Sequence, residues 1–329
     1  MRRGFCITAS NPFLSLKSSK SRFKTRTTNH IVLCTCLPAG RHRKSYIMHP
    51  TPTTITAADG YPLQASVFVP GQPNGRTVVV GSAMGVLQQY YYNFSEYLRG
   101  QGFHVVVFDY RGVGLSAPKR MKGFEAHLHQ WGELDIEAAL QYALHQLPTD
   151  TLLYMSHSVG GQVFGLAESN KHVQKVLMVA SQSGYWNLWE GYHKVRMFNI
   201  SHLAIPSLTA MVGYLPAKKL GLFEDVPKGV ANQWASWIRH PEYLFRESRP
   251  SLANFQNVTA PLRMISFSDD HFAPPQTVDN LATRYPNAAI ERINYTPEQF
   301  GLKEVGHFNY FKRKYAEWFW EDALEWLIS

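Results

Sequence analysis

The sequence predicts an α/β protein with a mostly parallel central sheet, helices on both faces and a helical cap insertion. Two observations carry this prediction. First, short and nearly continuous apolar runs alternate with stretches of helical periodicity, which is typical of βαβ units whose strands are buried on both faces. Second, residues 184–258 interrupt the alternation with an aromatic-rich stretch that has no strand-like run. A structureless loop of this length is uncommon in a compact domain, so we expect a helical cap there.

The individual elements follow in order along the chain. β-rich runs on either side of the turn signal Asp59-Gly60 predict an antiparallel hairpin over residues 53–70. Further strands are predicted at residues 76–83, 104–110, 151–155, 173–180, 262–268 and 288–295. Helices are predicted near residues 90–102, 131–147, 275–284 and 310–328, with one more directly after residue 158. Pro148 ends the helix over 131–147.

The net charge of +9 is concentrated at the amino-terminal end. Ten of the 33 Lys and Arg residues lie within residues 1–47, which contain no Asp or Glu, so the rest of the chain carries about −1. The predicted domain, residues 48–329, therefore lacks the basic footprint of a nucleic-acid-binding protein. All three cysteines also lie in the first 47 residues. We expect no disulfide and no cysteine-ligated metal in the domain.

The composition of residues 1–47 predicts that they form a basic, disordered leader. Their Ser, Thr and Arg content without acids is typical of an organellar transit peptide. We favour a start at Met48 or an unstructured tail, either of which gives a cytoplasmic protein, and the organellar transit peptide is the alternative. The apolar run IVLCTCL and every later run are far shorter than the ~20 residues that span a bilayer, so no stable membrane insertion is expected.

The stretch SHSVGGQ, residues 156–162, follows a predicted buried strand and leads into a helix. A serine on such a sharp turn presents its hydroxyl at the carboxyl edge of the sheet, provided that the residues two before and two after it are small. Ser156 and Gly160 satisfy this requirement around Ser158, although the usual G-x-S-x-G pattern has glycine at position 156. Ser158 is therefore predicted to be a nucleophile, the alternative being a serine in an ordinary strand-to-helix connection.

A serine nucleophile needs a base to take its proton and a third group to orient that base. Asp269 and Asp270 follow the next-to-last predicted strand, and His307 follows the last one. The chain order serine, acid, histidine is that of a triad on a parallel sheet. The oxyanion of the reaction would be bound by the backbone N–H of Val159 and by one from the loop after residues 76–83. We nominate Met84 for the second donor, with Ala83 as the other candidate.

Two other groups of residues are only weak signals of a cofactor or metal site. Gly112, Gly114 and Ala117 match the dinucleotide-binding pattern G-x-G-x-x-A. However, no apolar helix follows whose N-terminus could hold a pyrophosphate. His127, His129 and Glu133 are conceivable metal ligands, but no second cluster completes a site. No cofactor and no metal are predicted.

Together, SAMGV…YY, FDYRGVGLS, SHSVGGQ, SDDHFAPP and VGHF resemble the α/β-hydrolase superfamily over roughly residues 52–329. Within it the chain is similar to the serine aminopeptidase (S33) or monoglyceride-lipase-like branch, and most similar to a group of uncharacterised α/β hydrolases. The resemblance implies the α/β-hydrolase fold and the triad Ser158, Asp270 and His307. Asp270 is preferred over Asp269 because the acid of this superfamily usually stands four residues before a proline, here Pro274.

The predicted function is hydrolysis of a carboxylic ester of a small-molecule acyl substrate through an acyl-enzyme. An acyl group needs an apolar slot, and we expect Trp186, Trp189 and Trp234 to line it. An aminopeptidase must bind the free amine of its substrate, which calls for a carboxylate in the pocket. The insertion has few Asp and Glu residues compared with its aromatic residues, which disfavours an aminopeptidase. A serine aminopeptidase and an acyltransferase on the same residues stay open as alternatives. A peroxidase side activity or a non-catalytic binding protein is expected less, and no oligomeric state is predicted.

Overall fold

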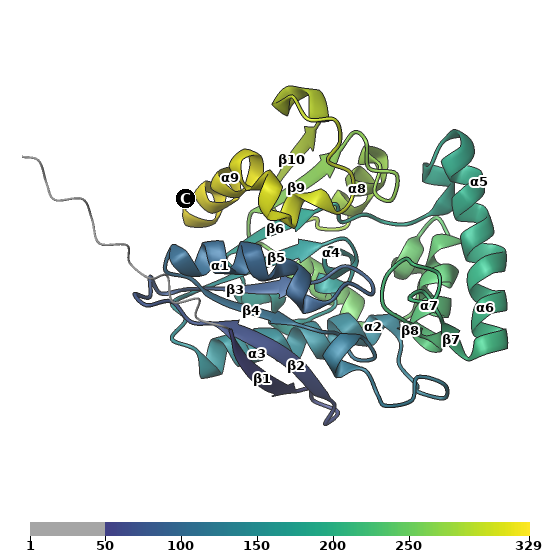
Figure 1. Cartoon of the computed structure of the whole chain (residues 1–329), viewed down its shortest axis with the longest axis horizontal. Helices are drawn as coiled ribbons and strands as arrows, with labels where there is room; N and C mark the ends of the chain where they lie inside the picture. The colour runs from purple at the N-terminus through teal and green to yellow at the C-terminus, as the bar shows by residue number, and fades with distance from the viewer. Residues whose placement is uncertain (1–49) are drawn as a thin grey trace, which may run out of the picture. The chain divides into compact units, whose positions relative to one another are not determined.

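The computed structural model describes residues 50–329, in which eight strands form the central sheet (Figure 1). The strands are β1 (Thr51–Thr56), β2 (Pro62–Phe68), β3 (Arg76–Gly81), β4 (His104–Phe108), β5 (Thr151–His157), β6 (Lys175–Val179), β9 (Leu262–Phe267) and β10 (Ile290–Tyr295). Their order across the sheet is β1-β2-β4-β3-β5-β6-β9-β10. The β1–β2 and β2–β4 pairs are antiparallel and the others are parallel. The predictions for residues 1–47, including the leader and its cysteines, lie outside the described residues.

Helices cover the sheet in the alternation that the sequence predicts. They are α1 (Tyr92–Gly100), α2 (Leu128–Gln130), α3 (Glu137–Gln146), α4 (Val159–Phe164), α8 (Pro275–Ala282) and α9 (Ala316–Ile328). α1 and α9 contact each other over one face, whereas α3 packs against β1, β3 and β4 on the other (Figure 1). The predicted fold class, an α/β protein with a mostly parallel sheet, is confirmed.

The central strands form because their side chains have no contact with water on either face. Val78, Val79 and Val80 of β3 are fully buried, as are all residues between 105 and 108 of β4. β-branched side chains pack well on such a pleated surface. One predicted helix has an irregular start, because residues 131–136 form a π-helical turn before α3. Gly132 lies there against α4, where a Cβ would overlap the carbonyl oxygen of Val163.

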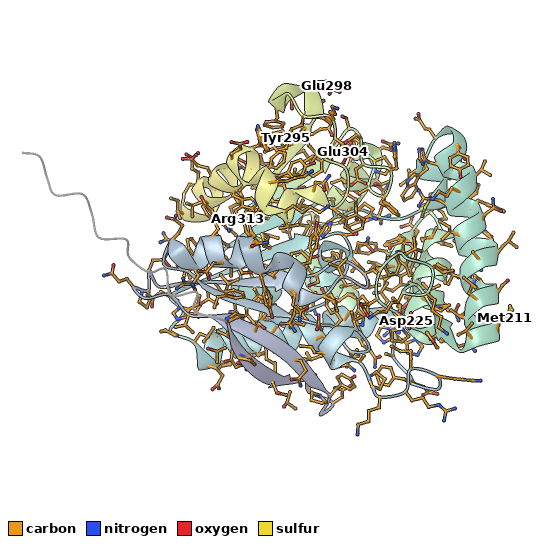
Figure 2. All side chains as sticks on the ribbon, viewed as in Figure 1. Met211, Asp225, Tyr295, Glu298, Glu304 and Arg313 are labelled. Carbon is orange, nitrogen blue, oxygen red and sulfur yellow. The ribbon has the colours of Figure 1, made fainter. Side chains whose placement is uncertain are left out.

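The segment over residues 184–258 is mainly helical and contributes no strand to the central sheet. It contains α5 (Gly191–Asn199), a π-helical turn η6 (Ile200–Ala204), α6 (Ile205–Val212) and α7 (Lys228–Ile238). Two very short strands, β7 (Tyr214–Leu215) and β8 (Val226–Pro227), pair beside α7. Residues 191–212 thus form one long helical segment at the edge of the molecule (Figure 1). Its outer side is exposed, as Met211 illustrates in Figure 2.

The G-x-G segment after β4 is a tight loop rather than the start of a helix. Gly112 and Gly114 have φ angles of 82° and 52°, which favour glycine, and only a three-residue 3₁₀ turn follows. The carboxylate of Asp109 accepts hydrogen bonds from the backbone N–H groups of Gln88 and Leu115 at 2.8 and 2.9 Å. The loop therefore supports the turn at residues 88–91, which lies beside the candidate site described below.

Candidate active site

Ser158 lies on a strained turn between β5 and α4. Its φ and ψ angles are 53° and −116°, a conformation that costs a non-glycine residue about 1–3 kcal/mol and is found mainly at functional sites. The turn is tight, because a Cβ on Gly160 would overlap the carbonyl group of Gly81. Ser156 fits in place of the usual glycine because its hydroxyl lies 3.2 Å from that of Ser181, within hydrogen-bond distance.

Asp270 and His307, far apart in the sequence, are brought into contact. His307 Nδ1 lies 2.7 Å from Asp270 Oδ2, and both side chains are buried. The other carboxylate oxygen of Asp270 accepts the backbone N–H groups of Phe272 and Ala273 at 2.8 and 2.9 Å. Since a carboxylate accepts, the Nδ1 of His307 carries the hydrogen, which leaves Nε2 free to act as a base. Ser158 and His307 line the same cavity.

Asp269 has a separate role that the sequence did not indicate. Its carboxylate accepts hydrogen bonds from the backbone N–H of Val305 at 2.8 Å and that of Gly306 at 3.0 Å. These residues directly precede His307. Asp269 therefore fixes the loop that carries His307, whereas Asp270 contacts the imidazole itself.

The two candidates for the second oxyanion donor differ in their hydrogen bonds. The N–H of Ala83 donates to the hydroxyl of Tyr91 at 2.8 Å. The N–H of Met84 has no acceptor among the described residues. Val159 is the first residue of α4, and the N–H groups of the first helical turn have no intrahelical acceptor. Met84 and Val159 also line the cavity with Ser158, so their N–H groups are available to a bound oxygen.

His157, next to Ser158, connects three parts of the site. Its Nε2 lies 2.8 Å from the carbonyl oxygen of His307, and its Nδ1 lies 2.9 Å from the hydroxyl of Tyr91. A carbonyl only accepts, so Nε2 donates and Nδ1 accepts from Tyr91. The Tyr91 oxygen in turn accepts the Ala83 N–H. The neighbouring Tyr90 donates its hydroxyl hydrogen to the carbonyl of Phe308. The turn at residues 88–91 thus holds the His307 loop to the loop after β3.

His157 is held in its neutral form. Complete burial lowers its pKa well below the usual 6.5, and the nearby His307 lowers it further. In the unfolded chain His157 takes up a proton near pH 6.5 that the folded chain does not bind. Acidification therefore favours unfolding, so the stability that this difference contributes is fully present above pH 6.5 and is lost as pH falls.

We predict that His157→Gln reduces this pH dependence. The glutamine amide keeps one donor and one acceptor but does not titrate. Below pH 6.5 the free energy of unfolding of the wild type should fall more steeply than that of the variant, by about 1.4 kcal/mol per pH unit. Urea unfolding of both proteins between pH 5 and 8 measures the difference. Parallel pH profiles would show that His157 titrates normally in the folded protein.

A cavity of about 260 Å³ opens at Ser158 and His307. It is lined mainly by aliphatic side chains from α5, η6 and α6, namely Met197, Ile200, Ala204, Ile205 and Leu208, with Leu215, Leu220, Leu222 and Phe223 beyond them. Arg196, Phe272 and Phe308 complete the wall near His307.

The three predicted substrate-binding tryptophans are placed differently. Trp234, on α7, lines the cavity. Trp189 does not, because it is buried and donates its Nε1 hydrogen to the carbonyl of His271 at 3.0 Å. Trp186 does not either, because its ring packs on Phe198, with the centroids 5.1 Å apart. The expected aromatic slot is therefore largely an aliphatic one.

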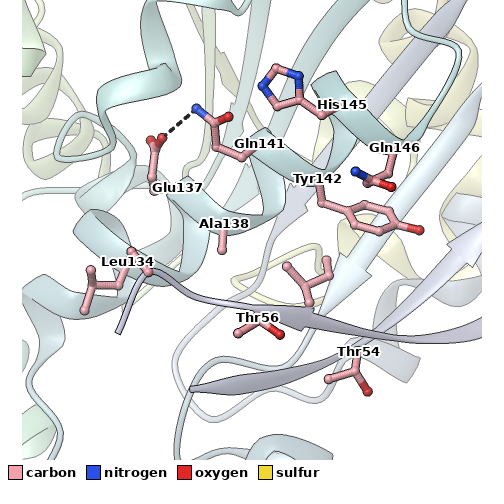
Figure 3. A pocket seen from close by; sticks show the side chains of 11 residues that line it. Thr54, Thr56, Leu134, Glu137, Ala138, Gln141, Tyr142, His145 and Gln146 are labelled. Atoms are coloured by element: carbon pink, nitrogen blue, oxygen red, sulfur yellow. Dashed lines mark hydrogen bonds between the residues drawn. The ribbon is translucent and has the colours of Figure 1, made fainter. Parts of the chain in front are cut away.

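A second hollow, of about 580 Å³, lies between β1 and α3 (Figure 3). Glu137 and Gln141 on its wall are hydrogen-bonded to each other at 3.0 Å. No candidate catalytic residue lines it. Within residues 50–329 there is no group of three or more His, Cys, Asp or Glu side chains that could hold a metal ion. Of the three residues weighed as metal ligands, His129 instead hydrogen-bonds Gln233.

Among the residues described, no helix is long and apolar enough to cross a membrane. Comparison with curated protein sequences gave no match. Residues 72–222 match the family described as serine aminopeptidase, S33.

Solved structures of hydrolases share the fold at low sequence identity. An esterase from Pyrococcus furiosus is 16% identical, with a TM-score of 0.56 over 84% of this chain and 90% of that one. An esterase from Exiguobacterium antarcticum is 15% identical, with a TM-score of 0.54 over 85% and 100%. Alpha/beta hydrolase domain-containing protein 10 from mouse is also 15% identical, with a TM-score of 0.53 over 85% and 100%.

The chain has the α/β-hydrolase fold, and residues 72–222 are similar to the serine aminopeptidase (S33) family of hydrolases. This likeness identifies a hydrolase fold but no substrate, because the fold hosts many chemistries.

Proposed function

We propose that the chain is a serine hydrolase that cleaves carboxylic esters with Ser158, Asp270 and His307 as its triad. The observation that carries the proposal is the buried Asp270–His307 hydrogen bond of 2.7 Å in a cavity that Ser158 also lines. The strained backbone at Ser158 supports it independently, because such strain is retained mainly where function requires it.

The reaction would proceed in two acyl-transfer steps. His307 Nε2 takes the proton of Ser158 as its oxygen attacks the ester carbonyl, and Asp270 stabilises the imidazolium. The N–H groups of Val159 and Met84 bind the resulting oxyanion. His307 then gives the proton to the leaving alcohol. Water, deprotonated by His307 in the same way, attacks the acyl-enzyme, and Ser158 recovers its proton when the acid leaves.

The lining of the cavity favours an ester over an aminopeptidase substrate. An aminopeptidase must bind a free ammonium group, which calls for a carboxylate in the cavity, but no Asp or Glu is among its lining residues. Glu224 is instead paired with Lys218 at 2.9 Å, and Asp225 accepts the backbone N–H of Lys218. The aliphatic wall suits an acyl chain, since each buried methylene contributes ~0.8 kcal/mol.

We therefore expect hydrolysis of short- and medium-chain p-nitrophenyl esters with little action on aminoacyl p-nitroanilides. Butanoate to octanoate esters and leucyl and alanyl anilides should be compared by kcat/KM, with Ser158→Ala as the control for background hydrolysis. Faster cleavage of the anilides would contradict the proposal. Loss of anilide cleavage in Glu224→Gln with Asp225→Asn would assign the amine-binding role to those acids.

A further inference from the structure

Among residues 50–329, Arg196 is the one permanently charged side chain that lines the cavity. It projects from α5, next to the cavity residue Met197. Its guanidinium carbon lies 4.8 Å from the ring centroid of Phe272. The Phe272 ring is in turn 5.4 Å from the ring of His307. The guanidinium is therefore stacked on the side chain that packs against the candidate catalytic base.

The guanidinium has no partner for its hydrogen-bond donors among residues 50–329. Several other arginines are paired there, for example Arg263 with Glu291 and Asp322, and Arg292 with Asp279. The Arg196 side chain makes neither an ion pair nor a hydrogen bond in that part of the chain, and it is only half-buried. The contact with Phe272 satisfies none of the five N–H groups of the guanidinium.

The titratable groups around Arg196 do not neutralise it. The rings of His193 and His271 stack with their centroids 4.1 Å apart, and the pKa of His193 is lowered by burial first and then by the charges of His271 and Arg196. Lys194 lies over Trp186 at 5.6 Å. The carboxylate of Asp270 is buried and already accepts three hydrogen bonds. Among residues 50–329, the Arg196 guanidinium, a permanent cation beside the apolar cavity, therefore has no counter-ion.

We propose that the cavity takes esters that carry a free carboxylate, and that Arg196 binds this carboxylate. A planar guanidinium matches a carboxylate through two parallel N–H···O bonds. The interaction is strengthened because the aliphatic wall lowers the local dielectric constant. The inference rests on the proposed ester hydrolysis and adds the class of substrate. The carboxylate can belong to the acyl chain or to the leaving alcohol, and both place an anion beside an apolar segment.

The test uses two pairs of esters that differ only in a methyl cap on the carboxylate. Mono-p-nitrophenyl adipate and its methyl ester place the charge on the acyl side. p-(Carboxymethyl)phenyl butanoate and its methyl ester place it on the leaving group. For each pair, kcat/KM for the free acid is divided by kcat/KM for its methyl ester. This ratio is measured for the wild type, Arg196→Gln, Arg196→Lys and Lys194→Gln. Lys194→Gln is the matched control, because this substitution removes one positive charge from α5 at a residue that does not line the cavity.

We expect the wild type to favour the free acid of at least one pair by about tenfold or more, which corresponds to about 1.4 kcal/mol. The pair that shows the preference identifies the side of the ester that bears the carboxylate. Arg196→Gln should bring that ratio to about one, Arg196→Lys should retain part of it, and Lys194→Gln should keep it.

Three results would overturn the inference: a wild-type ratio near one in both pairs, a ratio that Arg196→Gln leaves in place, or an equal loss in Lys194→Gln. If capped esters are cleaved in a Ser158-dependent manner without a preference for the acids, the carboxylate assignment alone fails. If none of the four esters is cleaved and Ser158 is inert, the proposed ester hydrolysis fails together with it.

Discussion

Ser158→Ala is expected to reduce kcat for ester hydrolysis by about 10⁴- to 10⁶-fold, the range typical for loss of a triad nucleophile. The Ser158 hydroxyl makes no hydrogen bond within residues 50–329, so its removal leaves no buried group without a partner. The melting temperature should therefore change little. Turnover of p-nitrophenyl butanoate and thermal unfolding measure both expectations on the same preparation, and a variant that keeps its activity would remove Ser158 from the mechanism.

Ser158→Gly extends this test to the strained backbone. With φ at 53°, a residue with a Cβ is strained at this position, whereas glycine is not. The glycine variant should be as inactive as Ser158→Ala but unfold at a higher temperature than the alanine variant. This gain is reduced by the greater entropy of glycine in the unfolded chain. A less stable glycine variant would show that the turn stores no strain.

Asp270→Asn is expected to reduce kcat by about 10⁴-fold, the size found when a triad acid becomes an amide. The reason is geometric. Two backbone N–H groups donate to Oδ1 of Asp270, so the amide oxygen of asparagine takes this position and its NH₂ faces His307. The imidazole must then accept at Nδ1 and carry its hydrogen on Nε2. In this tautomer His307 cannot take the proton of Ser158.

Asp269→Asn is the matched control one residue away. Within residues 50–329 its carboxylate is hydrogen-bonded only to the backbone N–H groups of Val305 and Gly306. An asparagine oxygen can still accept from them, so we expect a loss of about 1–3 kcal/mol of stability at most and a far smaller loss of kcat. Measuring kcat and urea unfolding for both variants separates the two roles. The reverse ranking would assign the acid to Asp269.

The fold was predictable from the sequence because its strands are buried on both faces and read as short apolar runs. The antiparallel pairing of β1 with β2 followed from Asp59-Gly60 between two β-rich runs. Irregular turns were not predictable: the π-helical turn over residues 131–136 lies where Gly132 closely approaches α4. No local pattern in the sequence records a contact of that kind.

Residues of the candidate site were predictable from the sequence where their position just after a strand is enough to place them in the fold. Ser158, Asp270 and His307 each follow a strand, so the fold itself places them at one edge of the sheet. Partners that meet only in the folded chain were missed: His157 contacts Tyr91, 66 residues away, and the His307 carbonyl, 150 residues away. Trp186 and Trp189 were expected at the slot, but they precede α5, and Met197 of α5 and Ile200 of η6 line the cavity instead.

The central claim is that Ser158 is an activated nucleophile. It is tested most directly by reacting the full-length protein with a fluorophosphonate and locating the adduct by peptide mass spectrometry. The account predicts one adduct, on Ser158, that is absent from Ser158→Ala, forms far more slowly in Asp270→Asn and forms at a similar rate in Lys194→Gln. An unlabelled wild-type protein, or an adduct on another residue that persists in Ser158→Ala, would contradict it.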